Sequence, residues 1–168
     1  TNAIIITGAA AEVTAALVTT ASLVVAATAK VTISDATDVS IAGTVLSAIG
    51  AKTSGVVTVT NDIVITGTAT EVTAALVTTA SLVVAATAKV TISDATDVSI
   101  AGTVLSAIGA KTGGVVTVTN DIIITGSNTE VTAALVTTDT LVVAATAKVT
   151  ISDGTDVSIA GTVLSAIG

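Results

Sequence analysis

The residues best suited to bind a cation occur in a short acidic motif that the chain repeats three times. The motif reads Ser-Asp-Ala-Thr-Asp from Ser34 and from Ser93, and Ser-Asp-Gly-Thr-Asp from Ser152. Two carboxylates with neighbouring hydroxyls at a turn are suitable ligands for a hard cation such as Ca²⁺, which takes six to eight oxygen ligands. The candidate ligands are Asp35, Asp38, Asp94, Asp97, Asp153 and Asp156.

A second interpretation of the same acidic motif is structural. The first Asp of each motif would cap a helix or a corner of the chain, and the second would be a solvated charge. The glycine-rich calcium-binding repeat GGxGxDxUx is absent from the sequence. We therefore favour the structural interpretation, keep Ca²⁺ binding as the alternative, and predict no other cofactor.

Threonine is the other residue type whose spacing suggests a binding surface. The sequence Val-Thr-Val-Thr at Val57–Thr60 places Thr58 and Thr60 on one face of a predicted strand. Rows of such pairs on a parallel sheet are typical of threonine-rich ice-binding proteins. Only one strand in each repeat of this chain carries the pair, and threonine also has a high strand propensity. Ice binding is therefore an alternative function.

The composition argues against several other classes of function. The chain has no Phe, Trp, Tyr, His or Cys, and its net charge is −7. It therefore lacks the basic surface and the stacking side chains of a nucleic-acid-binding protein. It also lacks the thiolates and imidazoles of soft-metal sites and of the common nucleophilic enzymes. Its apolar side chains are small and aliphatic, which favours smooth surfaces over substrate pockets. We therefore predict that the chain is not an enzyme.

The high hydrophobic content raises the question of a membrane protein. Hydrophobic residues make up 51% of the chain, and the mean hydropathy is +1.01. A membrane-spanning helix needs about 20 predominantly apolar residues. The uncharged run Val13–Ala29 is shorter than this and is interrupted by threonine. We predict no insertion into a membrane.

These candidate residues lie within a long internal repeat. The sequence KVTISDATDVSIAGTVLSAIGAKT begins at Lys30 and again at Lys89, and a near copy begins at Lys148. We predict one array over residues 1–168, with units 1–59, 60–118 and 119–168, the third being the shortest. Such internal identity is typical of proteins in which each unit packs on the next.

The elements expected to position the acidic motif are short strands and helical turns. Segments rich in β-branched residues predict strands. The Ser/Thr-x-x-Glu capping box predicts a helix after Thr68, and Asp94 predicts a further helical turn after it. Ala9 replaces the capping Thr in the first unit, so the helix start there is predicted to fray. The predicted strands are Val56–Thr60, Ile63–Thr66, Leu82–Ala85, Val90–Ser93 and Val98–Ala101.

The strand content and the repeat together predict the fold class. We expect a mainly-β protein with short helical turns, folded as a right-handed parallel solenoid of alternating strands and short helices. The alternative is a three-sided β-helix with turns of about 20 residues. The absence of aromatic residues fits either arrangement, because stacks of Val, Ile, Leu and Ala fill a thin repeating interior evenly.

The phrases TISDATDVSI and TGTATEVTAAL resemble the Thr/Ala/Val-rich tandem repeats of giant secreted or surface proteins of bacteria, cyanobacteria included. The residues that carry the resemblance are Thr70–Leu76 and Asp94–Val98. The resemblance covers the whole chain and is largely one of composition. It implies an adhesin-like or fibre-forming role at the bacterial cell surface or outside the cell, with another cell or a surface as a partner.

The two ends of the array predict a further partner. An array of stacked units normally closes its ends with polar capping repeats. Neither end of this sequence is unusually polar. We therefore expect both ends to expose rows of Val, Ile and Leu, and we predict head-to-tail self-association into a filament or a continuous array.

Overall fold

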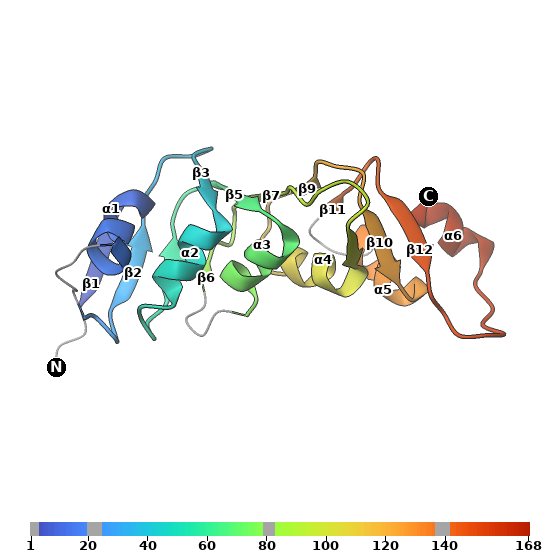
Figure 1. The fold of residues 1–168 in the computed structure, drawn as a ribbon, viewed down its shortest axis with the longest axis horizontal. Coiled ribbons are helices and arrows are strands. Elements are labelled where there is room, and N and C mark those ends of the chain that lie inside the picture. Colours follow the sequence, from blue (N-terminus) through green and yellow to red (C-terminus); the bar gives the residue numbers. More distant parts are fainter. Residues whose placement is uncertain (1–3, 20–24, 79–82, 137–141) are drawn as a thin grey trace.

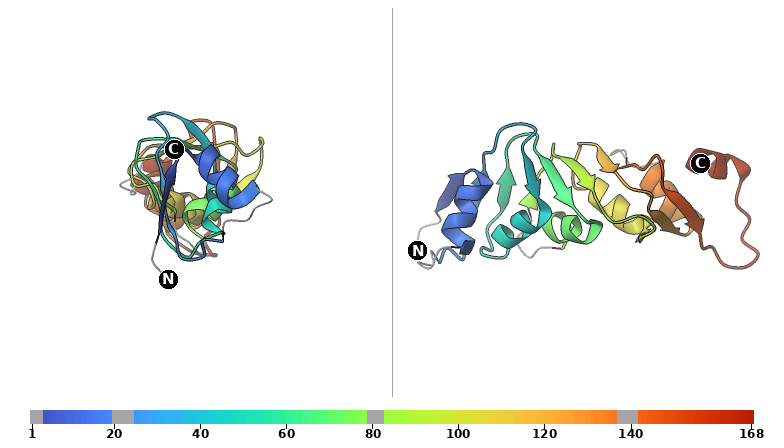
Figure 2. Two further views of the ribbon diagram at one scale, coloured as in Figure 1. Left: turned by 90° about the vertical axis from the view of Figure 1, so that its left-hand side faces the viewer. Right: turned by 45° about the horizontal axis from the view of Figure 1, so that its top comes forward.

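Strands and helices follow one another along an elongated molecule. The computed structural model describes residues 4–19, 25–78, 83–136 and 142–168. In Figure 1 the chain advances along the long axis from the N-terminus at one end to the last helix at the other, although single strands such as β6 and β11 fold back beside earlier elements. The right-hand view of Figure 2 shows the helices in a row beside the strands. The two ends of the array are therefore far apart.

Twelve strands in the described residues form three parallel sheets of four, five and three strands. The sheet orders are β1-β2-β4-β6, β11-β9-β7-β5-β3 and β12-β10-β8. The strands are β1 Ile5–Gly8, β2 Lys30–Ile33, β3 Ser40–Ala42, β4 Val57–Val59, β5 Val64–Gly67, β6 Val83–Val84, β7 Lys89–Ile92, β8 Ser99–Ala101, β9 Val116–Val118, β10 Ile123–Gly126, β11 Val142–Val143 and β12 Lys148–Ile151.

Helices connect many of the strands, and most are two turns long. The first helix continues into a π-helical segment, η1. Within each complete unit one helix follows a Val/Ile-Ile-Thr-Gly strand and another follows a Ser-Ile-Ala strand. The helices are α1 Ala10–Thr14, η1 Ala15–Thr19, α2 Gly43–Gly50, α3 Ala69–Leu76, α4 Gly102–Gly109, α5 Asn128–Leu135 and α6 Gly161–Ile167.

Each unit contains two segments that each include a helix, and we call these segments half-units. The register of the sheets shows that neighbouring strands come from successive half-units. Strand β1 pairs with β2 from Ile5 and Lys30 onwards, and β2 pairs with β4 from Val31 and Val57 onwards. Since every pair is parallel, each connection must cross from one end of a strand to the other, and the helices contribute to this crossing. The sequence separation between paired residues on neighbouring strands is larger than the roughly 20 residues per turn expected for a three-sided β-helix.

The predicted mainly-β, right-handed parallel solenoid is wrong, and so is the alternative of a three-sided β-helix. The chain is 32% helical and 26% strand, an α/β fold with three parallel sheets and six helices in its described residues. The helices are longer than the short turns expected from the sequence, because each buries an apolar face. In α2, for example, Leu46 and Ile49 are both fully buried. Burial of such a face stabilises a helix by more than the small differences in propensity.

The strand positions were predicted more successfully than the fold class. β4, β5, β7 and β8 each lie within one residue of the predicted bounds. The strand predicted at Leu82–Ala85 corresponds to β6, although Leu82 is outside the described residues. The period-2 alternation within β7 is also confirmed, because Val90 and Ile92 are buried while Lys89 is exposed.

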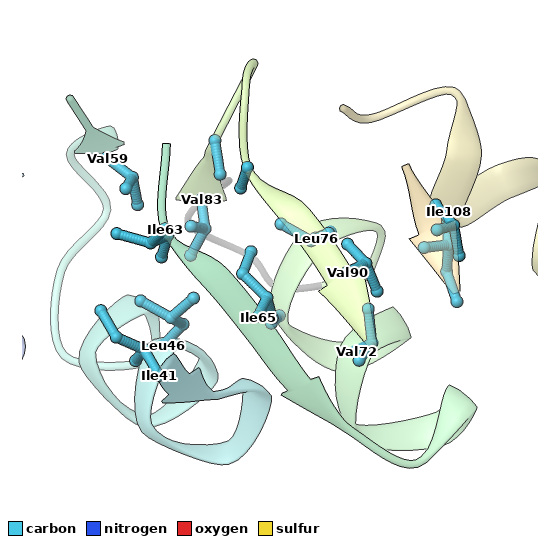
Figure 3. Close-up of a cluster of buried hydrophobic side chains, with 14 of the residues drawn as sticks. Ile41, Leu46, Val59, Ile63, Ile65, Val72, Leu76, Val83, Val90 and Ile108 are labelled. Atoms are coloured by element: carbon cyan, nitrogen blue, oxygen red, sulfur yellow. The ribbon is translucent and has the colours of Figure 1, made fainter. Parts of the chain in front are cut away.

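The interior is a continuous cluster of aliphatic side chains. Figure 3 shows a part of this cluster, in which side chains from strands and helices meet. Its largest fully buried members are Leu17, Ile33, Leu46, Ile49, Ile63, Ile65, Leu76, Ile92, Leu105, Ile108, Ile122 and Ile124. Burial of an aliphatic side chain of this size stabilises a fold by about 1.5–3 kcal/mol. Because these residues recur between Leu17 and Ile124, the stabilisation accumulates from unit to unit over this part of the chain.

Two glycines are required where one chain segment crosses another. Gly55 packs so closely on Ala29 that a Cβ atom would overlap the carbonyl oxygen of Ala29, and Gly114 packs in the same way on Ala88. The hydroxyl of buried Thr53 also donates a hydrogen bond of 2.5 Å to that oxygen of Ala29. These contacts hold successive half-units together through main-chain atoms.

The capping box predicted after Thr68 is confirmed. Thr68 Oγ1 accepts from the backbone nitrogen of Glu71 at 3.3 Å, and Glu71 Oε2 accepts from the backbone nitrogen of Thr68 at 2.8 Å. The predicted fraying at Ala9 is not seen. Helix α1 begins at Ala10, the position equivalent to Ala69, because Glu12 Oε2 still accepts from the backbone nitrogen of Ala9 at 2.9 Å.

Candidate functional site

The acidic motif follows a strand in each unit, and in the first two units it leads to a strand of a different sheet. It follows β2 and precedes β3 in the first unit, and it follows β7 and precedes β8 in the second. In the third unit it follows β12. We call the three segments Asp35–Asp38, Asp94–Asp97 and Asp153–Asp156 the acidic turns. Their two carboxylates have different surroundings, so the first and second Asp have different roles.

The first Asp of each acidic turn caps a helix of the preceding half-unit. Asp94 Oδ2 accepts from the backbone nitrogen of Ala69 at 2.6 Å, at the start of α3. Asp35 makes the same bond to Ala10 at 2.7 Å, and Asp153 makes it to Asn128 at 2.8 Å. A carboxylate at a helix N-terminus satisfies an unpaired donor and interacts favourably with the helix dipole.

This capping differs from the arrangement expected from the sequence. The helical turn was expected directly after Asp94, but the residues that follow form a turn and then β8, and α4 begins only at Gly102. Asp94 instead caps α3 through Ala69, which precedes it by 25 positions. The sequence around Asp94 resembles a capping motif whether the capped helix follows it or precedes it. Which helix is capped depends on the register between strands β5 and β7.

The second Asp of each acidic turn has a left-handed backbone conformation. The φ angles of Asp38, Asp97 and Asp156 are 64°, 62° and 64°. Asp is one of the few residues other than glycine that enters this region readily. The backbone nitrogen of Asp97 donates to the carbonyl oxygen of Asp121 at 2.8 Å, which ties the turn to the next strand connection.

In the first two acidic turns the side chain of this second Asp forms an ion pair with a lysine two half-units later. Asp38 Oδ1 lies 2.7 Å from Lys89 Nζ, and Asp97 Oδ1 lies 2.7 Å from Lys148 Nζ. The hydrogen bond and the charge of Asp38 raise the pKa of Lys89 above its ordinary value, and Asp97 raises the pKa of Lys148 in the same way. The interacting residues are 51 positions apart in both cases.

Through these contacts the carboxylates connect one half-unit of the chain to another. No group of three or more Asp or Glu side chains in the described ranges is arranged to hold a metal ion. The assignment of Asp35, Asp38, Asp94, Asp97, Asp153 and Asp156 as Ca²⁺ ligands stays a prediction.

Threonines of neighbouring strands are aligned in rows. Thr7 pairs with Thr32, and Thr32 pairs with Thr58, so one row crosses β1, β2 and β4. At these positions each strand contributes a single threonine to the row. Thr60, the partner of Thr58 in the predicted pair, donates its hydroxyl to the carbonyl oxygen of Ile33 at 3.1 Å instead. A second row crosses β5, β7 and β9 at Thr66, Thr91 and Thr117.

A hollow of the described surface lies at the C-terminal end. It is an open cavity of about 580 Å³ lined by aliphatic residues, which include Ile124, Val149, Leu164 and Ile167. The equivalent residues one unit earlier, Ile65, Val90, Leu105 and Ile108, are all buried in the core. The cavity is therefore a part of the repeating interior that is open at this end.

Side chains of the same cluster are exposed at the N-terminal end. Ile4 is 50% exposed, whereas Ile63 and Ile122, its equivalents in the other units, are fully buried. Leu164 at the opposite end is 45% exposed, whereas Leu46 and Leu105 are fully buried. We call the two surfaces the N-terminal face (Ile4, β1 and α1) and the C-terminal face (residues 157–168 and the cavity beside α6). The exposed aliphatic rows predicted from the sequence are present on both.

No family model, curated protein or solved structure matches this chain. The resemblance to bacterial surface repeats therefore stays a prediction from the sequence. Within the described ranges, none of the helices has both the length and the apolar character needed to cross a membrane.

Proposed function

We propose that this chain is a structural repeat segment that associates end to end into longer assemblies. Its role in this proposal is mechanical rather than catalytic. The contacts of the acidic turns support this proposal, because they join half-units of the array through helix caps and ion pairs.

One observation carries the proposal: the same contacts join neighbouring half-units again and again in the described residues. Asp35, Asp94 and Asp153 each cap a helix that begins 25 positions earlier. The ion pairs Asp38–Lys89 and Asp97–Lys148 are likewise equivalent. Units that pack on one another through equivalent contacts are typical of extended repeat proteins.

Sedimentation velocity over a range of concentrations tests the proposal. We expect species larger than the monomer to accumulate between about 1 µM and about 1 mM, the range that corresponds to about 4–8 kcal/mol of association free energy. The association should increase in sulfate salts, which strengthen hydrophobic contacts. A monomer throughout this range, in both low and high salt, would contradict the proposed function.

The extracellular bacterial setting and the adhesive role rest on the resemblance of the repeats alone. They are part of the proposal, with another cell or a surface as the second partner. Binding of the fluorescently labelled chain to bacterial cells tests this part. Equal binding by a chain of the same residues in scrambled order would contradict it.

A ligand-binding role is the second candidate, and the aligned threonine rows are the observation that favours it. Thr7, Thr32 and Thr58 lie in register across three strands. Thermal hysteresis of the purified chain that is lost in Thr32→Val would support ice binding. A melting temperature that rises with millimolar Ca²⁺ and no longer does so in Asp97→Asn would support a calcium-binding role.

A further inference from the structure

We propose that a groove beside β8, and its equivalent beside β3, bind an extended peptide segment that carries small side chains and one Lys or Arg. The segment lies along the free edge of the strand, and its basic side chain binds Asp94 or Asp35. The β8 groove lies between α3 and α4, in the middle of the described residues, and has a volume of about 370 Å³. The β3 groove lies one unit earlier, between α1 and α2, with a volume of about 520 Å³. This inference is independent of the proposed end-to-end association.

The free edge of β8 is the first observation. β8 is the outermost strand of its sheet, with β10 as its neighbour on one side. The backbone nitrogen of Ile123 donates to the carbonyl oxygen of Val98 at 2.9 Å. Because backbone groups alternate in direction along a strand, those of Ser99 and Ala101 point away from β10. Ala101 is the N-cap of α4, so its carbonyl belongs to the helix. The N–H and C=O of Ser99 and the N–H of Ala101 are thus oriented toward an added strand.

The β8 groove lies on this free side of the strand. One wall is α3, with Ala69 and Thr73, and the other is β8 with the start of α4, including Ser99 and Val104. None of its lining residues belongs to β10. A segment in the groove therefore runs between strand and helix, with its backbone beside the edge of β8. The volume is near the lower end of the range for ligand pockets, about 300–1,000 Å³, so the segment needs small side chains.

The β3 groove repeats this arrangement. β3 is the outermost strand of the five-stranded sheet, and the backbone nitrogen of Val64 in β5 donates to the carbonyl oxygen of Val39 at 2.9 Å. The backbone groups of Ser40 therefore point away from β5. Residues of α1 line the opposite wall of the groove. The same groove thus occurs at equivalent positions of two units.

Alternating close and open junctions between helices explain where the grooves lie. A Cβ atom at Gly43, at the start of α2, would lie 3.0 Å from the carbonyl oxygen of Glu71 in α3. One at Gly102, at the start of α4, would lie 2.9 Å from the carbonyl oxygen of Glu130 in α5. The junctions of α2 with α3 and of α4 with α5 are thus closed by main-chain atoms. The grooves occur at the junctions of α1 with α2 and of α3 with α4.

Asp94 provides a hydrogen-bond acceptor inside the β8 groove. It lines the groove and is only 9% exposed. Its Oδ2 accepts from the backbone nitrogen of Ala69, whereas its Oδ1 accepts no hydrogen bond within the described ranges. In the third unit Asn128 replaces Ala69, and Asn128 Nδ2 donates to Asp153 Oδ1 at 3.2 Å. A side-chain donor therefore fits at this oxygen. In the β8 groove the amino or guanidinium group of the bound segment takes the place of the Asn128 amide.

The charge of the surroundings favours a basic segment. Among the described residues, Asp94 is the one charged residue that lines the β8 groove, and Asp35 is the one that lines the β3 groove. The net charge of the chain is −7. A cation at the free carboxylate oxygen makes a charge-assisted hydrogen bond, whereas an acidic segment is repelled.

Titration with a short peptide tests the proposal, with acetyl-Lys-Ala-Thr-Ala-Thr-amide as the probe. The chain has no cysteine of its own, so a trifluoromethyl tag on Thr70→Cys reports on the β8 groove, which Thr70 lines from an exposed position. The same tag on Lys111→Cys, exposed and outside the groove, is the control. In fluorine NMR we expect only the Thr70 tag to shift, with a dissociation constant of about 1 mM, as suits a few backbone hydrogen bonds and one charged contact. No shift of the Thr70 tag, or equal shifts of both tags, overturns the proposal.

A change of charge tests the role of Asp94. Replacement of the Lys of the peptide by Glu should weaken binding to the Thr70-tagged chain by at least about tenfold. In the Asp94→Asn variant of this chain the preference for Lys over Glu should largely disappear. Circular dichroism checks that the variant keeps the fold. Equal binding of the two peptides by the tagged chain that retains Asp94 overturns the proposed contact.

Proline at the strand edge tests strand addition. Ser99→Pro removes the outward N–H of β8 and spares the backbone groups that face β10. It should weaken binding of the Lys peptide by at least about tenfold, whereas Ser99→Ala, the matched control, keeps the N–H and the binding. A peptide with N-methylated backbone nitrogens should not bind to the unchanged groove. Unchanged binding by a folded Ser99→Pro variant, or equal binding of the N-methylated peptide, overturns strand addition.

A second copy of the chain is the competing occupant. Ser40→Pro/Ser99→Pro blocks both strand edges. If the wild-type chain self-associates, this double variant does not, and the peptide leaves the Thr70 tag unshifted, the grooves hold a second copy and the peptide proposal is overturned. Peptide binding by a chain that stays monomeric supports the grooves and contradicts only the proposed end-to-end association.

Discussion

Asp94 Oδ2 lies 2.6 Å from the backbone nitrogen of Ala69, a residue 25 positions earlier at the first turn of α3. The bond joins two neighbouring half-units, and the same bond occurs at Asp35 and Asp153. The most acidic motif of the sequence therefore links successive parts of the fold. This relationship explains why the first acidic residue recurs in every unit without any requirement for a bound cation.

Replacement of Asp94 tests its role as a helix cap. Asp94→Ala should lower the free energy of unfolding by about 1–2 kcal/mol, because it leaves a helix donor unpaired and removes a favourable charge at the N-terminus of α3. Asp94→Asn should recover part of this loss. Urea denaturation provides the measurement, with Asp62→Ala as a control for the loss of one exposed carboxylate. Equal stability of the two alanine variants would contradict the capping role.

Ala9 in the first unit and Thr68 in the second occupy the same N-cap position, and this difference provides a second test of helix capping. Thr68→Ala removes the hydroxyl that accepts from the backbone nitrogen of Glu71. The loss of such a cap should lower the unfolding free energy by about 1 kcal/mol. Ala9→Thr should raise it by a similar or smaller amount, because the first unit then gains the same bond. A destabilised Ala9→Thr variant in thermal denaturation would show that the two helix starts are not equivalent.

The glycines at chain crossings give a third prediction. In Gly114→Ala the new methyl group overlaps the carbonyl oxygen of Ala88, which should destabilise the fold by about 1–3 kcal/mol. Gly154→Ala is the matched control. Nothing lies within 4 Å of its Cβ position, and the other units have alanine there. The control should be neutral or slightly stabilising. Similar melting temperatures for both variants would contradict the close approach.

The internal ion pairs predict a dependence on pH. Asp38 raises the pKa of Lys89 above its ordinary value of 10.5, so the folded state holds this proton more tightly than the unfolded chain. The stabilisation is therefore complete below pH 10.5 and is lost as the pH rises through the raised pKa. The melting temperatures of wild type and Lys89→Gln should differ slightly at about pH 8 and converge above this range. A difference that grows at high pH would contradict the assignment.

The sequence predicted local elements well because their signals are local. The alternation of Val90 and Ile92 with polar residues defined β7, and the spacing of Thr68 and Glu71 defined the start of α3. The exposed aliphatic ends were also predicted, since they depend on comparing the ends with equivalent internal residues. The fold class was not, because the helix content depends on how far each helical turn extends, and tertiary packing decides this, as in the burial of Leu46 and Ile49 in α2.

The role of the acidic turns was only partly predictable for a related reason. A capping role for Asp94 was foreseen, but the helix it caps lies earlier in the chain, at Ala69. The pairing of Asp38 with Lys89 likewise depends on two successive steps between strands. These steps are unequal in length, so the repeat alone does not reveal them.

Sedimentation velocity of the wild-type chain tests the proposed end-to-end association most directly. The account predicts that species larger than the monomer accumulate between about 1 µM and about 1 mM. A chain that stays monomeric throughout this range would contradict it.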